Sequence, residues 1–204
     1  MSDLQIFNCE QGTPEWFAAR AGIPTASEFS TVMMKLGPRG GVPLTRQKYL
    51  YQLAGQRLTG NVEEGYTNAN MERGHQQEAE ARALYEMATD NVVQQVGFLR
   101  LGSMGASPDG LVGEDGAVEI KTAFAHIQIA RLLQGTIPPE HVAQVQGVMM
   151  VADRQWCDFV SYCPGLPPLI VRVNRDGEFC TTMFQDIMQF NDEIESLCDR
   201  IRGL

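Results

Sequence analysis

The chain has 204 residues, of which 44% are hydrophobic and 20% charged, as in ordinary globular proteins, and we expect one domain over residues 1–204. It carries 16 Lys and Arg against 25 Asp and Glu, a formal net charge of −9. That is the wrong sign for non-specific coating of nucleic acid, so any contact with DNA would have to be local, through clustered arginines and bound cations.

Helices are predicted for most of the first 90 residues. Residues 13–15, Thr-Pro-Glu, form a helix start with a cap, a first-turn proline and an acidic residue, and this helix ends at the Gly-Ile-Pro of residues 22–24. A second helix, capped by Thr25 or Ser27, is expected to run to about residue 36, before a glycine-rich loop. Two longer helices are expected over residues 45–58 and 68–88.

From residue 92 the pattern changes to short strands alternating with helices. A stretch rich in β-branched and apolar residues predicts extended structure over residues 92–101. The expected strands are 104–106, 117–121, 156–162 and 169–173, and the expected helices are 124–133, 139–151 and 179–202. The order of elements predicts an α/β domain with a mixed central β-sheet flanked by helices.

A short β-hairpin carries the most chemistry in the chain. The run Ser107-Pro108-Asp109-Gly110 is followed by the turn signal Asp115-Gly116 and then by Glu119-Ile120-Lys121. Reversing the chain at that turn brings Asp109 back toward Glu119. Since side chains alternate along a strand, Ala117, Glu119 and Lys121 share one face, while Val118 and Ile120 point into the core.

Two carboxylates beside a lysine could form a divalent-metal site next to an amine that handles protons. The same residues also have simpler interpretations. Asp109 lies between a proline and a glycine, as turn aspartates do, and Glu119 with Lys121 could be a solvated strand face with weak ion pairing. The short pattern alone leaves nuclease chemistry and coincidence open.

Three other segments bear on this choice. Glu78 lies within the helix predicted over residues 68–88, and Gln144 lies on a helix expected to pack near the hairpin. Arg20 precedes Ser27 by seven residues, and an arginine near a helix start is a phosphate-binding arrangement. Each segment by itself could equally be a solvated surface or an ordinary helix cap.

Taken together, five ordered blocks between residue 16 and about residue 173 resemble the phage lambda exonuclease family, also called YqaJ-type viral recombinases or alkaline exonucleases. The blocks are the tryptophan–arginine–Thr-Ala-Ser-Glu segment of 16–28, residues 74–78 with the following Ala-Glu-Ala-Arg, and the segments 107–110, 119–121 and 143–146. The resemblance implies a restriction-endonuclease-like core and a homotrimeric ring. It also implies 5′-to-3′ degradation of one strand of linear double-stranded DNA to mononucleotides, which leaves a 3′ tail for recombination by strand annealing.

The resemblance also implies roles for the residues of the hairpin. Asp109 would be shared by two Mg²⁺ ions, for which Mn²⁺ could substitute, and Glu119 with the backbone carbonyl of Ile120 would ligate one of them. Lys121 would orient or deprotonate the attacking water. Glu78 and Gln144 would line the same catalytic site.

Four more residues would contact the DNA. Arg20, Ser27 and Ser107 would bind the terminal 5′-phosphate, and Arg39, on the glycine-rich loop, would reach the DNA near the cut. A ring with an acidic exterior and a locally basic channel would also reconcile the net charge with a DNA substrate. A single-strand annealing protein is the expected partner.

Composition gives the expected location. No apolar run approaches the roughly 20 residues that span a bilayer, and the first residues lack the basic and apolar regions of a secretory signal. The five cysteines are dispersed without a Cys-x-x-Cys pair, which favours reduced thiols. We therefore expect a cytoplasmic bacterial protein, encoded by a phage or prophage, without a membrane partner.

Two alternative functions remain open at this stage. One is a restriction-like endonuclease with the same core, and the other is a non-catalytic protein that binds DNA ends as a recombination scaffold. A nuclease with an iron–sulfur cluster is disfavoured because the chain lacks four clustered cysteines.

Overall fold

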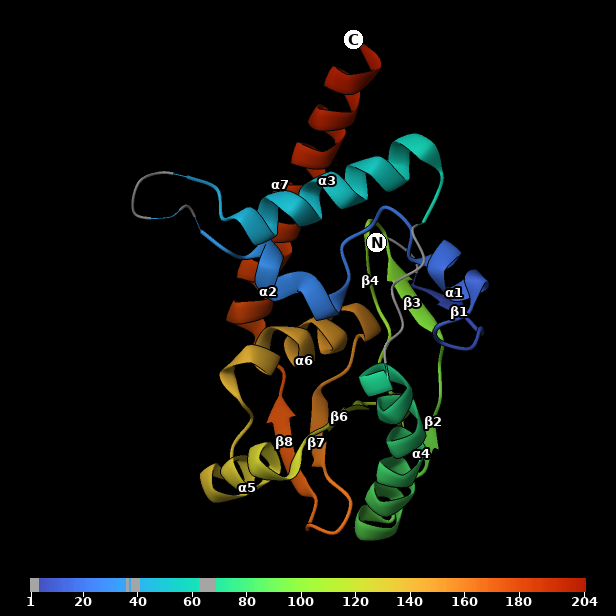
Figure 1. The fold of residues 1–204 in the computed structure, drawn as a ribbon, viewed down its shortest axis with the longest axis vertical. Coiled ribbons are helices and arrows are strands. Elements are labelled where there is room, and N and C mark those ends of the chain that lie inside the picture. Colours follow the sequence, from blue (N-terminus) through green and yellow to red (C-terminus); the bar gives the residue numbers. More distant parts are fainter. Residues whose placement is uncertain (1–3, 36, 38–40, 63–68) are drawn as a thin grey trace.

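The structure is a computed structural model that describes residues 4–35, 37, 41–62 and 69–204 (Figure 1). Its helices are α1 (Pro14–Ala19), the short 3-10 helix η1 (Ala26–Glu28), α2 (Phe29–Val32), α3 (Leu44–Thr59), α4 (Ala69–Thr89), α5 (Ala125–Gln134), α6 (Pro139–Ala152) and α7 (Gly177–Arg202). Its strands are β1 (Leu4–Phe7), β2 (Val93–Gln94), β3 (Phe98–Leu101), β4 (Met104–Ala106), β5 (Gly110–Val112), β6 (Gly116–Thr122), β7 (Trp156–Tyr162) and β8 (Leu169–Asn174).

The strands of the described residues form two sheets. A three-stranded sheet has the order β1-β3-β4, and a five-stranded sheet has the order β2-β5-β6-β7-β8. Strands β6 and β7 run parallel, while the other neighbours in both sheets are antiparallel. The parallel pair requires a long crossover, which α5 and α6 supply. The mixed α/β architecture predicted from the sequence is confirmed.

Helices cover both faces of the five-stranded sheet (Figure 1). On one face, Ala117 of β6 and Phe159 of β7 join the main hydrophobic core, to which α2, α3, α6 and α7 contribute. On the other face, Val118 and Val160 pack with Tyr85 of α4 in a second cluster. The shared face of Ala117, Glu119 and Lys121 is therefore covered by α6, and β6 is buried on both sides.

Local sequence explains several element ends. The Thr13 side chain accepts a hydrogen bond from the Trp16 N–H at 3.4 Å, with Pro14 in the first turn of α1, as expected. Helix α3 ends at Thr59 and is capped by Gly60, which has a φ of 68°, a left-handed conformation that glycine adopts without strain. No described helix has the length and apolar character to cross a membrane.

Some predicted boundaries were wrong. The second helix is a 3-10 turn followed by α2, which ends at Val32, and neither η1 nor α2 has a side-chain cap hydrogen bond. Thr25 occupies the N-cap position of η1, but its Oγ1 accepts a hydrogen bond from the Arg20 Nη2 at 3.0 Å instead of capping the helix. The extended stretch 92–101 is divided between the two sheets, with β2 in one and β3 in the other. Gly97, between these strands, lies so close to the chain after β1 that a Cβ there would be 2.1 Å from the Cys9 carbonyl oxygen. Strand β1 was not predicted.

Candidate active site

The β5–β6 hairpin positions Asp109 as the sequence predicts. Gly110 pairs with Val118 and Val112 with Gly116, so the chain reverses over residues 113–115. Gly113 has a φ of 55°, in the left-handed region. Asp109, just before β5, accepts a hydrogen bond from the Ile120 backbone N–H. The carboxylate is thereby held against the strand that carries Glu119.

The Ile120 carbonyl has a defined direction relative to Asp109. The N–H and C=O of one strand residue point to the same neighbour, and the Ile120 N–H points to Asp109. Strand β5 begins only at Gly110, opposite Val118, so it does not pair with this part of β6. The Ile120 carbonyl therefore faces the side on which Asp109 lies, as its predicted role as a metal ligand requires.

Glu119 is the most deeply buried acid of the site, with 1% of its surface exposed. Its Oε1 accepts hydrogen bonds from the Lys121 Nζ, at 2.6 Å, and from the Gln144 amide Nε2 of α6. Its Oε2 is buried without a hydrogen-bond partner among the described residues. A buried carboxylate oxygen without a partner is costly unless a cation or a donor binds it.

The charges of this cluster influence one another. Burial, and then the neighbouring Glu119, raise the pKa of Asp109 well above its usual value, although Lys121 acts in the opposite direction. Burial disfavours the charged form of Lys121, but the carboxylates of Glu119, Asp109 and Glu78 together raise its pKa above the usual lysine value. Two acids and one ammonium group thus share a poorly solvated space.

The donor set fits a magnesium ion. No cluster of three or more His, Cys, Asp or Glu side chains that could hold a metal occurs among the described residues. Mg²⁺, however, is usually held by one or two carboxylates together with water and substrate phosphates. Asp109 and Glu119 supply two carboxylates, and the free Oε2 of Glu119 supplies a buried oxygen without a competing partner. The residues present therefore fit an oxygen-ligated divalent cation.

Arg20 lies beside this cluster with its charge available. Its guanidinium lies 4.0 Å from the centroid of the Trp16 ring, and its Nη2 donates to the Thr25 Oγ1 at 3.0 Å. Within the described residues it forms no ion pair with a carboxylate. Burial lowers the pKa of Arg20, opposed by Tyr49 and Glu28, but an arginine stays charged. A partly desolvated, unpaired guanidinium is suited to binding an anion.

Hydroxyl groups surround Arg20. The Thr25 Oγ1 lies 3.2 Å from the Ser27 Oγ, and the Trp16 indole N–H donates to the Ser107 Oγ at 2.8 Å. The sequence pattern gave Thr25 only a capping role, and its contact with Arg20 was missed. The nearby Arg20 and Ser27, five residues before and two residues after Thr25, were the available signal.

One small cavity gathers most of the predicted residues. It has a volume of about 170 Å³. Its lining comprises Gln11, Trp16, Arg20, Thr25, Ala26, Ser27, Ser107, Asp109, Glu119, Lys121, Gln144 and Val148. The predicted phosphate contacts and the predicted catalytic residues therefore face the same space. Gln11 was not predicted; its amide holds the loop before β5 by donating to the Pro108 carbonyl at 3.1 Å.

Glu78 and Arg39 stand apart from this cavity. Glu78 lines an adjoining cavity of about 640 Å³ that also contains Asp109, and its Oε1 accepts from the Arg82 Nη2 at 2.6 Å. The acid lies near enough to raise the pKa of both Asp109 and Lys121. Arg39 lies outside the described residues, so the structure says nothing of its predicted contact.

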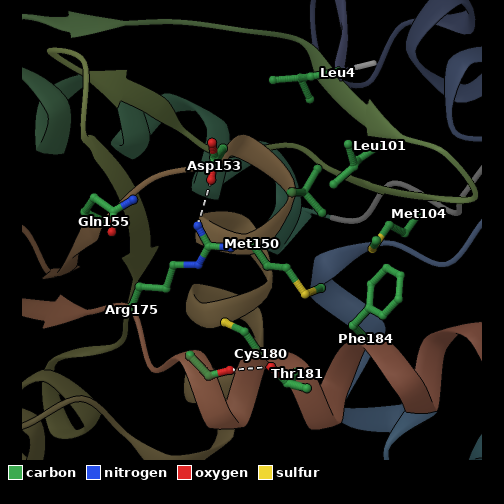
Figure 2. A pocket seen from close by; sticks show the side chains of 12 residues that line it. Leu4, Leu101, Met104, Met150, Asp153, Gln155, Arg175, Cys180, Thr181 and Phe184 are labelled. Carbon is green, nitrogen blue, oxygen red and sulfur yellow. Dashed lines mark hydrogen bonds and ion pairs between the residues drawn. The ribbon is translucent and has the colours of Figure 1, made fainter. Parts of the chain in front are cut away.

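A larger cavity, about 840 Å³, lies elsewhere and contains none of the predicted site residues (Figure 2). Met104, Met150 and Phe184 give it an apolar lining, and the ion pair between Arg175 and Asp153, at 2.8 Å, lies among its polar groups. No set of converging acids and bases comparable to the Glu119 cluster lines it. The volume of this cavity therefore does not by itself make it the candidate active site.

Comparison with known proteins gives a family and a fold. Residues 15–155 match the model of the YqaJ-like viral recombinase domain. The chain is 38% identical to a solved alkaline exonuclease, LHK-Exo, from Laribacter hongkongensis, with a TM-score of 0.85 over 94% of this chain and 97% of that chain. The structure of LHK-Exo in complex with dAMP gives the same identity and coverage and a TM-score of 0.84.

A more distant structure agrees in fold alone. A phage-related exonuclease from Haemophilus somnus shares 14% identity at a TM-score of 0.66, over 88% of this chain and 96% of that chain. No curated protein matched the chain.

The mixed sheet with helices on both faces is the restriction-endonuclease-like fold that the similar alkaline exonucleases also have. On this core, Asp109 before β5 and the acid–x–lysine pair Glu119 and Lys121 of β6 line one cavity with Arg20. The chain belongs to the YqaJ-like viral recombinase family. The resemblance recognised in the sequence is thus confirmed.

Proposed function

We propose that this protein is a Mg²⁺-dependent exonuclease that degrades one strand of linear double-stranded DNA from its 5′ end. Mononucleotides would be released, and a 3′ single-stranded tail would remain for recombination by strand annealing. The observation that carries the proposal is the single cavity in which Arg20 lies beside Asp109, Glu119 and Lys121. Family membership supports it, as does the similar exonuclease solved with dAMP, a deoxynucleoside monophosphate like the expected product.

The acids would hold the metal ions. Asp109 would be shared by two Mg²⁺ ions, or Mn²⁺ in their place, and Glu119 with the Ile120 carbonyl would complete the protein ligands of one. When bound, such ions supply an activated water and neutralise charge on the leaving oxygen. Lys121 would orient or deprotonate the attacking water, and its ion pair with Glu119 holds its ammonium group at that place.

Other side chains would position these groups. The Gln144 amide donates to the Glu119 Oε1, as Lys121 does, so that the Glu119 Oε2 is left without a hydrogen-bond donor among the described residues. Glu78 would act from the adjoining cavity on the Asp109 side.

Direction would come from the phosphate contacts. Arg20, Ser27 and Ser107 would bind the terminal 5′-phosphate, with Trp16 holding Ser107 through its indole N–H. A phosphate monoester exists only at a chain end, so a pocket for it beside the metal ligands would place the first internal phosphodiester at the catalytic cluster. Arg39 would contact the DNA near the cut.

The assembly and biological setting are part of the same proposal. Residues 1–204 would act as one nuclease domain, and three copies would form a ring around the DNA. An acidic exterior with a net charge of −9 would then be compatible with a substrate held in the channel. A single-strand annealing protein would take up the exposed 3′ strand, and a viral recombinase family points to a phage or prophage origin.

Closed and linear DNA distinguish this proposal from the two alternatives. Purified protein is incubated with Mg²⁺ and either a linear duplex carrying 5′-phosphates or the same sequence as a closed circle, with Asp109→Asn as the control. We expect loss of the linear duplex only, and no loss with the control. Nicking of the circle would indicate an endonuclease, whereas end binding by the wild type without degradation would indicate a scaffold.

A further inference from the structure

On β7, an aromatic ring and a hydroxyl group lie directly beside the Glu119 and Lys121 positions of β6. In the parallel register, Glu119 pairs with Phe159 and Lys121 pairs with Ser161. Paired residues of adjacent strands point to the same face, which is the face covered by α6. Phe159 and Ser161 are both completely buried. The groups that contact Phe159 and Ser161 therefore also lie next to Glu119 and Lys121.

A chain of hydrogen bonds runs from Ser161 to His141. The Ser161 Oγ donates to the Oε1 of the buried Gln128 at 2.6 Å and accepts from the Arg131 Nη1 at 3.0 Å. The Arg131 Nη2 lies 3.0 Å from the His141 Nε2. Arginine has no acceptor, so the His141 Nε2 must accept, and the imidazole is neutral with its proton on Nδ1.

Packing and charge agree with a neutral imidazole close to the catalytic cluster. The His141 ring stacks on the Phe159 ring, with 5.2 Å between centroids. Burial, followed by the charges of Lys121 and Arg131, lowers the pKa of His141 to about 4, opposed by Glu140. Lys121 therefore lies near enough to act on the ring.

Helix α6 connects this network to Glu119. His141 and Gln144 are three residues apart on α6, so they lie on one side of the helix. Gln144 bonds the Glu119 carboxylate, while His141 is held by Arg131 against β7. Displacing His141 would rotate or lift this part of α6 and with it the amide that holds Glu119.

We propose that Arg131 and His141 are positioning residues of the catalytic centre, which hold α6 and Gln144 in register with Glu119 and Lys121. The inference rests on the nuclease function proposed above. Neither residue needs to contact DNA or metal for this role. Arg131 forms no ion pair with a carboxylate in the part of the chain that the structure describes. Its guanidinium is held by the hydrogen bonds to Ser161 and His141 and by the Phe159 ring, whose centroid lies 5.9 Å away.

Two substitutions at one position separate hydrogen bonding from packing. His141→Phe keeps an aromatic ring against Phe159 but removes the acceptor for Arg131, whereas His141→Gln keeps an acceptor oxygen and loses the ring. His126→Phe is the matched control, because His126 is exposed on α5 and stacks on Phe124 at 6.2 Å. Initial rates on 5′-phosphorylated linear duplex give kcat and KM at a temperature at which circular dichroism shows all variants folded.

We expect His141→Phe to lower kcat about 10-fold with KM for DNA unchanged, since loss of a group that orients a metal ligand typically has such an effect. His141→Gln should stay within about 3-fold of wild type, and His126→Phe should match it. Arg131→Met combined with His141→Phe should be no worse than Arg131→Met alone, because the hydrogen bond that His141→Phe removes is already absent in Arg131→Met.

Three results would contradict the proposal in distinguishable ways. Wild-type kcat in His141→Phe, with only a lower melting temperature, would reduce the pair to a structural role. Equal losses in the Phe and Gln variants would show that the acceptor atom is not what matters. A wild-type protein that digests no duplex would overturn the proposed nuclease function, and this inference with it.

Discussion

Replacing Arg20 with alanine should remove the preference for phosphorylated DNA ends. The guanidinium packs 4.0 Å from the Trp16 ring centroid, donates to Thr25, and forms no ion pair with a carboxylate among the described residues. Its remaining donors are therefore available to a phosphate. Alanine would leave the Ser27 and Ser107 hydroxyls as the only predicted contacts to the terminal phosphate.

The size of the effect follows from the kind of contact. Hydrogen bonds between charged groups contribute about 1.5–3 kcal/mol each. Loss of one such contact to the reacting substrate corresponds to a decrease of about 10- to 150-fold in kcat/KM on 5′-phosphorylated ends. A 5′-hydroxyl end has no terminal phosphate for Arg20 to contact, so we expect kcat/KM on this substrate to change by less than about 3-fold.

The assay measures initial rates on two linear duplexes that differ only in the 5′ group. Arg46→Ala is the matched control, because Arg46 also packs on an aromatic ring, that of Phe190 at 4.8 Å, but is paired with Glu193 outside the cavity. The control should keep the ratio of the two rates. Equal losses on both ends in Arg20→Ala would refute the assigned role, as would no loss on either end.

Four further predictions concern the same centre and the fold around it. Lys121→Ala should lower kcat by about 100-fold or more while DNA binding, measured by fluorescence anisotropy, stays near wild type; wild-type turnover would remove the lysine from the reaction. Glu119→Gln should raise the Mg²⁺ concentration for half-maximal activity about 10-fold or more, and an unchanged Mg²⁺ titration would argue against a metal ligand. The pKa of His141 is lowered to about 4 in the folded protein. As the pH decreases, His141 is therefore protonated in the unfolded chain before it is protonated in the folded protein, and the free energy of unfolding should decrease between about pH 6.5 and pH 4. The full shift corresponds to about 3 kcal/mol, which partial exposure reduces to about 1–2 kcal/mol; urea denaturation should show this loss in the wild type and not in His141→Gln. Gly147→Ala places a Cβ 2.4 Å from the Phe29 Cδ2 and should destabilise the fold by about 1–3 kcal/mol in the same measurement.

The hairpin could be predicted because its determinants are local. A two-residue side-chain period and a turn signal suffice to bring Asp109 next to Glu119 and to place Lys121 on the same face as Glu119. The expectation that Val118 and Ile120 alone point into a core was too simple. Strand β6 pairs in parallel with β7, and such strands are buried on both faces.

Contacts between distant elements could not be predicted in this way. Thr25 or Ser27 was expected to cap a helix, but the Thr25 hydroxyl accepts from Arg20 and its backbone forms a parallel bridge with Gly105 of β4. The link between Arg131 and His141 depends on α5 and α6 packing on the same sheet face, which no short sequence pattern specifies. The division of residues 92–101 between two sheets likewise involves pairing with strands distant in the sequence, β3 with β1 and β2 with β5. In each case tertiary packing decided the outcome.

The central claim is that the cavity around Asp109, Glu119 and Lys121 hydrolyses DNA from a 5′ end with a divalent metal. Digestion of linear duplexes labelled at one 5′ end or at one 3′ end, with Mg²⁺ or with EDTA, tests it most directly. We expect early release of the 5′ label as a mononucleotide, late release of the 3′ label, and no release in EDTA. Early release of the 3′ label, or release of either label in EDTA, would contradict it.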